Sequence, residues 1–417
     1  MSPLNLLPNA ESFTFWSPTD AQTPVFFKED HGVLGAQCIN KPHCFGKWIG
    51  RAAIQAGETY TAAVECSVEN MPMSAGHDAN NVYAMLNWLN KDGTYLRREY
   101  LEVAWQPEGS PHNWIHMTCT TAAPENAVTA EIELTLSTPG TVRWRNNSLT
   151  EAYPIRPRPV RIASAFFTPR RNLALNLETM LALADQAGQM QADVLLFTES
   201  CYDRGVTPIQ AKAVPIPSAG PDDVLGQLGA KAKQYSCNIL VNITECENGF
   251  FFNSTVLLDR NGQYIGKYRK SHLPIVEKEA GFSPGNELPV FVTDFATIGV
   301  MTCFDLAFMD IGRTLRNKGA QLIFVPTIGN FMLYSQMLAK DTGMYVVVSG
   351  GDMPHPSRII NPNGDIIACV DGTADGIAFM EIDLSKNFYS PGTGFFPAAS
   401  NARNALYNQR RHELYRF

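Results

Sequence analysis

The sequence predicts an α/β domain preceded by an all-β sandwich domain. The chain has 417 residues, which is more than one ordinary hydrophobic core serves, so two domains are expected. All six tryptophans lie within the first 150 residues. The proline-rich stretch EAYPIRPRPV at 151–160 cannot continue a helix and predicts a linker. We therefore place the sandwich at 1–155 and the α/β domain at 156–417, with a C-terminal tail from about 387.

The first region contains short strand-like runs and no helical period of useful length. Runs such as TYTAAVECSVEN and AVTAEIELTLS are rich in Thr and Val, and several alternate apolar with polar residues. The sequence KDG at 91–93 marks a turn between two of these runs. Together these features predict an antiparallel β-sandwich.

The composition excludes several classes of function. The net charge is −7 and no run of Lys or Arg occurs, which argues against nucleic-acid and anionic membrane partners. No apolar stretch reaches the length of about 18 residues that a membrane span needs. The start, MSPLNLLPNAES, lacks the pattern of a secretory signal, and the nine cysteines are scattered without a CxxC pair. We therefore expect a cytoplasmic protein with mostly reduced cysteines and no metal site.

Helical and strand patterns alternate in the second region. NLALNLETMLALADQAGQM and DVLGQLGAKAKQYS carry apolar residues at helical spacing, as do IGRTLRNKGA and FMLYSQMLAKD. Short apolar runs between them predict strands: RIASAFF, DVLLFT, CNILVNIT, STVLLDR, TIGVMTC, LIFVPT, YVVVSG and GIAFMEIDL. RNGQ and NPNGD predict hairpin turns.

Three polar residues follow predicted strands, where α/β proteins build their sites. Glu199 ends DVLLFTE, Lys270 follows GQYIGKYR, and Cys303 ends TIGVMTC. A cysteine nucleophile needs a base for its proton, and an ammonium group stabilises the oxyanion that the attack produces. The three residues would thus form acyl-transfer machinery. Singly, Glu199 could cap a turn, Lys270 could be solvated, and Cys303 could be a small buried apolar residue.

The local sequences around these residues carry a family resemblance. LLFTES, GKYRKSHLP and GVMTCFDLAF occur in order, with EKEAGFSPGNELPVF between the last two. From about 160 to 385 the chain thereby resembles the nitrilase, or carbon–nitrogen hydrolase, superfamily. The resemblance implies an αββα four-layer sandwich, Glu199 as general base, Lys270 as oxyanion stabiliser and Cys303 as nucleophile. It also implies the backbone N–H of Phe304 as a second oxyanion donor, and no metal or organic cofactor.

A second glutamate commonly lies between the lysine and the cysteine in this superfamily. The sequence VEKEAGF offers Glu277 and Glu279. The leading Glu-Lys pair favours Glu277, and one additional residue before Phe282 keeps Glu279 as a substitute. The alternative is that both are solvated surface carboxylates.

Departures from the superfamily pattern bear on the substrate. Phe304-Asp305 after the cysteine resembles the amidase-like branch, whereas nitrilases have Trp-Glu. Phe308-Met309-Asp310 replaces the usual Phe-Pro-Glu, and LAKDT at 338–342 lacks the usual arginine.

We therefore expect hydrolysis of a small amide or carbamoyl compound. Acyl transfer, nitrile hydrolysis and an inert hydrolase module in a carbohydrate- or protein-binding protein remain alternatives. A low-pKa Cys303 would react rapidly with thiol probes, which separates an active from an inert module.

The first region resembles galactose-binding-like jelly-roll modules. The resemblance rests on NLLPNAESFTFW, on W-x-x-x-DG from Trp88 to Gly93, on Trp114 and on GTVRWRNNSLTE. Exposed aromatic faces could bind a carbohydrate. The alternatives are that most tryptophans form the core, or that this region serves packing or oligomerisation.

We also expect a homodimer, because the superfamily resemblance implies association through helices near the active site and two-fold pairs are the commonest assembly. The tail from Asn387 to Phe417 is rich in residues typical of interfaces. They are Phe395, Phe396, Tyr407, Arg410, Arg411, Tyr415 and Phe417. Alternatively, the tail wraps its own subunit.

Overall fold

The chain divides into two compact units in the computed structural model. It describes residues 4–71, 82–103, 114–217, 220–329, 331–351, 355–370, 372–390 and 400–401. The first unit comprises Met1–Arg156 together with Asn387–Phe417, and the second comprises Pro157–Lys386. Strand β11 ends at Glu151 and β12 begins at Pro159, so the division falls inside the proline-rich stretch that the sequence marks as a linker.

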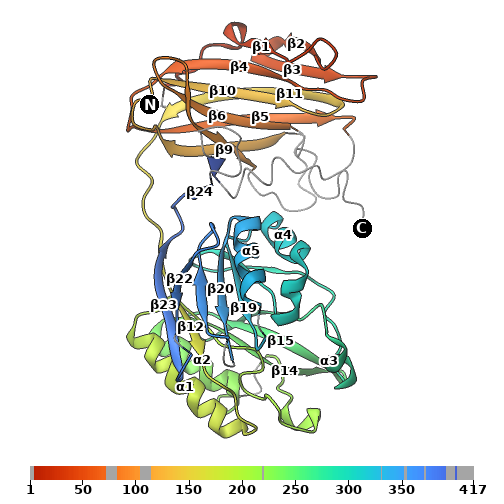
Figure 1. The fold of residues 1–417 in the computed structure, drawn as a ribbon, viewed down its shortest axis with the longest axis vertical. Coiled ribbons are helices and arrows are strands. Elements are labelled where there is room, and N and C mark those ends of the chain that lie inside the picture. Colours follow the sequence, from red (N-terminus) through yellow and green to blue (C-terminus); the bar gives the residue numbers. More distant parts are fainter. Residues whose placement is uncertain are drawn as a thin grey trace. The chain divides into compact units, whose positions relative to one another are not determined.

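The first unit is built from two antiparallel sheets (Figure 1). One has the order β1 (Thr14–Trp16), β4 (Gly46–Ala53), β10 (Thr129–Leu136), β6 (Val82–Leu89) and β7 (Tyr95–Tyr100). The other has the order β2 (Val25–Glu29), β3 (Val33–Cys38), β11 (Gly140–Glu151), β5 (Thr59–Glu69), β9 (Ile115–Ala122) and β8 (Glu102–Val103). The predicted antiparallel β character of this region is therefore present, and its galactose-binding-like identity stays a prediction.

Three of the six tryptophans lie in the core of the first unit. Trp48, Trp88 and Trp144 are buried in the hydrophobic cluster of this unit. Trp16 is 45% exposed and Trp114 is half-buried. Trp105 lies outside the described residues. Because large apolar side chains stabilise a sandwich core strongly, burial accounts for three of the six tryptophans without a ligand.

The start of the C-terminal tail belongs to the first unit. This corrects its placement with the α/β domain. Strand β24 (Tyr389–Ser390) pairs with β25 (Ser400–Asn401), and the Tyr389 hydroxyl donates to Glu99 at 2.8 Å. The guanidinium of Arg97 lies over the Tyr389 ring at 5.1 Å. A buried carboxylate gains a donor from this contact, which holds the segment to the sandwich. The aromatic and arginine residues from Phe395 to Phe417 lie outside the described residues.

The second unit contains two mixed six-stranded sheets. The first sheet has the order β16 (Tyr264–Arg269), β15 (Phe250–Leu258), β14 (Asn238–Glu247), β13 (Val194–Leu196), β12 (Pro159–Phe166) and β23 (Gly376–Asp383). The second has the order β17 (Val290–Val292), β18 (Thr297–Val300), β19 (Leu322–Pro326), β20 (Tyr345–Ser349), β21 (Arg358–Ile360) and β22 (Ile366–Cys369). The central strands β12, β13 and β14, and β18, β19 and β20, run parallel.

Helices cover the outer faces of both sheets (Figure 1). Helices α1 (Leu173–Gln189) and α2 (Val224–Tyr235) share a hydrophobic cluster with the first sheet. Helices α4 (Met309–Asn317) and α5 (Met332–Thr342) share another with the second sheet. Asn172 and Asp223 cap α1 and α2 by accepting from backbone N–H groups. Among the described residues, no helix is long and apolar enough to cross a membrane.

The two sheets face each other through β12 and β20. Ser164 Oγ donates to the carbonyl oxygen of Val348 at 2.8 Å, and Ser349 Oγ donates to that of Ala165. Thr198 Oγ1 donates to the carbonyl oxygen of Thr327 at 2.9 Å. Thr198 and Thr327 follow β13 and β19, so this last bond joins the sheets at the strand ends where the candidate residues lie.

Candidate active site

Glu199 lies three residues beyond β13 and is almost fully buried. Its Oε1 accepts from Asn253 Nδ2 at 2.9 Å, and its Oε2 accepts from the backbone N–H of Ile328 at 3.3 Å. Asn242 holds the following turn by accepting from the N–H of Ser200 at 2.7 Å, and it donates to Asn253 Oδ1 at 2.8 Å. These amide contacts fix one orientation of the carboxylate.

Lys270 follows β16 directly and brings its ammonium group to Glu199. Nζ lies 2.9 Å from Glu199 Oε1 and 2.5 Å from Glu277 Oε1, and the side chain is fully buried. Burial alone would lower the pKa of Lys270, but Glu199, Cys303 and Glu277 together raise it well above its usual value. The site therefore favours the charged ammonium form of Lys270.

Glu277 is the glutamate that the structure brings to Lys270, whereas Glu279 is exposed. Both lie on the short helix α3 (Ile275–Glu279), which the sequence analysis did not predict. Burial and the charge of Glu199 raise the pKa of Glu277 even though Lys270 opposes the shift. Glu277 Oε2 is buried and has no hydrogen-bond partner among the described residues.

Cys303 begins the single-turn helix η4 (Cys303–Ala307) with a left-handed backbone, φ +48°. Non-glycine residues rarely adopt this conformation, which costs about 1–3 kcal/mol and clusters at functional sites. Thr302 and Asp305 form a capping box that holds the turn. A Cβ atom on Gly329 would lie 3.6 Å from the sulfur, so the backbone at Gly329 closes one side of the site.

The electrostatics of the cysteine differ from the expected low-pKa thiol. Burial and the negative charge of Glu199 raise the pKa of Cys303 to about 12, although Lys270 opposes this. Burial would also raise the pKa of Glu199, but Lys270 and the hydrogen bond from Cys303 hold it below its usual value. The resting pair is therefore a neutral thiol beside a carboxylate that can accept its proton.

Aromatic side chains follow Cys303 in the chain and lie beside Gly329. The Phe304 and Phe308 rings meet edge to face at 5.4 Å, and His272 stacks on Phe308 at 4.0 Å. The Phe331 ring and the Cys303 sulfur lie 2.7 Å and 3.6 Å from the Cβ position that a side chain at Gly329 would take.

Asp305 is fully buried and contacts residues on both sides of Lys270. The sequence analysis used it only to distinguish branches of a superfamily. Asn253 was also missed, because nothing in its local sequence separates it from an ordinary strand residue. In LAKDT, Asp341 pairs with Arg313 at 2.7 Å, so this divergent stretch joins α5 to α4.

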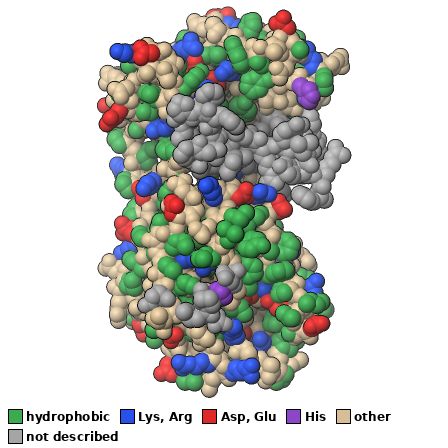
Figure 2. Space-filling view, in the orientation of Figure 1, with side chains coloured by type: hydrophobic (Ala, Val, Ile, Leu, Met, Phe, Trp, Pro, Cys, Tyr) green, Lys and Arg blue, Asp and Glu red, His purple; other side chains and the backbone are tan. Residues whose placement is uncertain are grey.

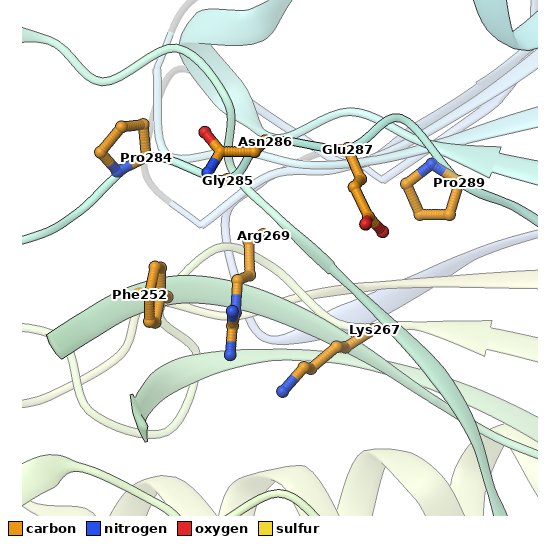
Figure 3. A pocket seen from close by; sticks show the side chains of 8 residues that line it. All are labelled: Phe252, Lys267, Arg269, Pro284, Gly285, Asn286, Glu287 and Pro289. Atoms are coloured by element: carbon orange, nitrogen blue, oxygen red, sulfur yellow. The ribbon is translucent and has the colours of Figure 1, made fainter. Parts of the chain in front are cut away.

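A cavity of about 270 Å³ lies elsewhere in this unit (Figure 3). Its lining residues are Phe252, Lys267, Arg269, Pro284, Gly285, Asn286, Glu287 and Pro289. Side chains alternate along a strand, so Lys267 and Arg269 point away from the face of Tyr268 and Lys270. Both cations pair with Glu245 and Glu247. This cavity is therefore separate from the Glu199 cluster.

Within the described part of the chain, no group of three or more His, Cys, Asp or Glu residues could hold a metal ion. The chemical groups of the site are a thiol, two carboxylates and one ammonium group. Glu199, Lys270 and Cys303 are all buried, in a unit made of two helix-covered sheets.

The chain belongs to the carbon-nitrogen hydrolase family, whose profile matches residues 161–387, more than half of the chain. It is thus a carbon–nitrogen hydrolase by family. The probable nitrilase C965.09 of Schizosaccharomyces pombe is 29% identical over 224 residues, 48% of this chain and 80% of that protein. The omega-amidase NIT2 of Xenopus tropicalis is 25% identical over 267 residues, 58% of this chain and 91% of that protein.

A solved structure supports the fold. A variant of the amidase from Nesterenkonia sp. AN1 matches with a TM-score of 0.51 and 20% identity, over 63% of this chain and 97% of that chain. In that structure, the acetamide moiety of fluoroacetamide is covalently added at the active-site cysteine. At this identity the match supports the fold of the second unit alone.

Proposed function

We propose that the protein hydrolyses a small amide or carbamoyl compound through a thioester on Cys303. The observation that carries this proposal is the buried cluster in which Glu199 contacts both Lys270, at 2.9 Å, and the thiol of Cys303. Structural cysteines need no paired base and cation, whereas a cysteine nucleophile needs both.

In the first half-reaction, the Cys303 thiol transfers its proton to Glu199 as the sulfur attacks the carbonyl carbon. The carbonyl π electrons move to oxygen and form an oxyanion, which the Lys270 ammonium and the N–H of Phe304 stabilise. Phe304 is the second residue of η4, and the first N–H groups of a helix have no acceptor within that helix. The carbon–nitrogen bond then breaks, and Glu199 returns its proton to the departing ammonia or amine.

In the second half-reaction, water attacks the thioester. Glu199 takes a proton from the water, the carbon–sulfur bond breaks, and the proton passes to sulfur as the carboxylic acid leaves. Acceptance of an amine or alcohol in place of water would give acyl transfer. The neutral resting thiol fits this scheme, because the proton moves only when substrate is attacked.

Glu277 has two roles in this proposal. Its Oε1 holds Lys270, and its partnerless Oε2 is placed to accept a hydrogen bond from a substrate N–H. An amide or carbamoyl NH₂ offers such a donor, whereas a nitrile offers none. This favours amides over nitriles, in line with the amidase names of several relatives.

The test is ammonia release from a panel of simple amides, ω-amides, N-carbamoyl amino acids and nitriles. We expect turnover of at least one amide or carbamoyl compound, and its loss in Cys303→Ala. Cys66→Ala is the matched control, because Cys66 is a buried cysteine of the other unit. Turnover that survives in Cys303→Ala would contradict the proposed mechanism, and turnover of nitriles alone would contradict the substrate class.

We further propose a homodimer that associates through α5. Its exposed apolar residues are Met332, Leu333, Tyr334 and Met337. Hydrophobic side chains gather over α5 on the face shown in Figure 2. Contiguous exposed apolar surface is typical of an interface. Light scattering should give twice the chain mass of 46.0 kDa, and a monomer mass would contradict the proposal.

A further inference from the structure

The Asp305 carboxylate is a buried hub with donors from two separate segments. Its Oδ2 accepts from the Tyr268 hydroxyl at 2.7 Å and from the backbone N–H of Thr302 at 2.9 Å. Its Oδ1 accepts from the backbone N–H of His272 at 2.9 Å and from Ser271 Oγ at 3.2 Å, and it lies 3.1 Å from His272 Nδ1. A buried carboxylate with this many donors is held rigidly in place.

These donors bracket the proposed cation and adjoin the proposed nucleophile. Tyr268 lies two residues before Lys270 and His272 lies two residues after it, while Thr302 directly precedes Cys303. One carboxylate thus ties the end of β16 to the start of η4, although the two segments are more than 30 residues apart. The same carboxylate completes the capping box that holds Cys303 at positive φ.

We propose that Asp305 is a positioning residue that locks the cysteine turn and the lysine turn into one unit. This proposal rests on the proposed function. It adds that Asp305 is the residue that sets the distance between the Lys270 ammonium group and the Cys303 sulfur. Catalytic groups need placement within about 0.5 Å, and a displacement of about 1 Å costs roughly 10²-fold in rate. Asp305 need not touch substrate to have this effect.

The two variants that test it are Asp305→Asn and Tyr268→Phe. Asparagine keeps the size of the side chain but places an NH₂ group against donors, whereas Tyr268→Phe removes only one hydroxyl. The matched control is Tyr235→Phe, because Tyr235 also donates to a carboxylate, Asp185, at 2.9 Å between α1 and α2. Thermal unfolding of each variant separates loss of fold from loss of positioning.

The readout is the rate of alkylation by iodoacetamide, resolved by peptide mass spectrometry and followed from about pH 6 to about pH 10. Exposed Cys246 in the same protein is the internal reference. We expect Asp305→Asn to slow labelling of Cys303 relative to Cys246 at least about tenfold at each pH in this range. Tyr268→Phe should slow it about two- to fivefold, and Tyr235→Phe should leave it unchanged.

The direction in which the labelling rate of Cys303 changes distinguishes an effect of Asp305 on position from an effect of its charge. Removing a nearby negative charge favours the thiolate, so an effect of charge alone would speed labelling in Asp305→Asn. Faster or unchanged labelling of Cys303 at each pH, in both folded Asp305→Asn and folded Tyr268→Phe, would overturn the proposal. If Asp305→Asn fails to fold, the Tyr268→Phe result decides in the same way.

Wild-type labelling distinguishes this proposal from the proposed function. If Cys303 in the wild type labels no faster than Cys246 at any pH and no amide is turned over, the proposed function itself fails. If the wild type labels faster or turns over an amide, and the variants match it, only the positioning role fails.

Discussion

Two buried cysteines, one in each unit, share a raised pKa for different physical reasons. Burial alone raises the pKa of Cys66 in strand β5 to about 12. Cys303 reaches about the same pKa through burial together with the charge of Glu199, against the opposing charge of Lys270. The shift itself therefore does not mark a reactive cysteine. What distinguishes Cys303 is the base and the cation beside it and its positive φ.

Buried carboxylates in the two units differ in the same way. Glu131 in β10 is fully buried, but its partner Arg51 has a side chain that is 61% exposed. Such a pair keeps one charge in contact with water, which limits its desolvation cost. Glu199 and Lys270 are both buried, so both charges lose their contact with water and both carry a desolvation cost. A buried charge pair of this kind is a candidate functional site.

The largest effect should come from removing the two cysteines in turn. Cys303→Ala should reduce turnover of a confirmed amide below detection, at least about 10³-fold, because the nucleophile is lost. Cys66→Ala should leave turnover unchanged and lower stability by about 1–3 kcal/mol through loss of buried volume. Steady-state rates and thermal unfolding measure the two effects. Equal losses of turnover in Cys303→Ala and Cys66→Ala would contradict a catalytic role that is specific to Cys303.

Removing one partner of the buried pair should have the next largest effect. Glu199→Gln and Lys270→Met should each lower kcat at least about 10²-fold, because the base or the oxyanion cation is lost. Lys270→Met should also destabilise the unit by about 3–5 kcal/mol, since it leaves the buried Glu199 and the half-buried Glu277 without their cation. Lys270→Arg should not restore the rate, because the planar guanidinium differs in shape. Near-normal rates in both Glu199→Gln and Lys270→Met would contradict the proposed roles.

The pH dependence follows from the lowered pKa of Glu199. The carboxylate must be ionised to act as base, so kcat/KM should fall only below its ordinary value of 4.5. A lowered folded pKa also contributes stability above the unfolded value, and this is lost as pH falls through the folded value. Glu277 has a raised pKa, so its own titration would add a second fall in kcat/KM at a pH above 4.5. The pH dependence of kcat/KM is therefore measured in Glu277→Gln, in which residue 277 does not titrate. A surviving acid limb near neutral pH in that variant would contradict this assignment.

The smallest effect should come from the tail contact in the first unit. Tyr389→Phe removes the hydroxyl that donates to Glu99, and should lower stability by about 1–2 kcal/mol without changing turnover. Tyr153→Phe is the matched control, because Tyr153 is 93% exposed. Thermal unfolding compares them. Equal stability of the two variants would show that the tail contact does not stabilise the sandwich.

Local sequence patterns predicted most elements of the second unit. Apolar runs with turn residues at their ends indicated the strands, including the hairpins at RNGQ and NPNGD, which join β15 to β16 and β21 to β22. Helix α3 was missed because five residues are too few for a periodic pattern. The tail was placed with the wrong unit, because pairing of Tyr389 with Glu99 is a contact between residues 290 positions apart.

The site could be predicted only in part. Glu199, Lys270 and Cys303 stand at strand ends in recognisable motifs, and the structure brings them together. The choice between Glu277 and Glu279 depends on which face of α3 meets Lys270, and the spacing of VEKEAGF did not determine this. The hydrogen bonds of Asp305 were not predicted, because Tyr268, Ser271 and His272 donate to it from more than 30 residues away in the sequence.

The central claim is that Cys303 carries the acyl group during turnover. The most direct measurement is an acid quench during turnover of a confirmed amide, followed by peptide mass spectrometry. We expect the mass of the acyl group on the peptide that contains Cys303, and no such adduct in Cys303→Ala or on the peptide that contains Cys66. Steady consumption of the amide under conditions that preserve thioesters, with no adduct on Cys303 at any quench time and with full turnover in Cys303→Ala, would contradict the account.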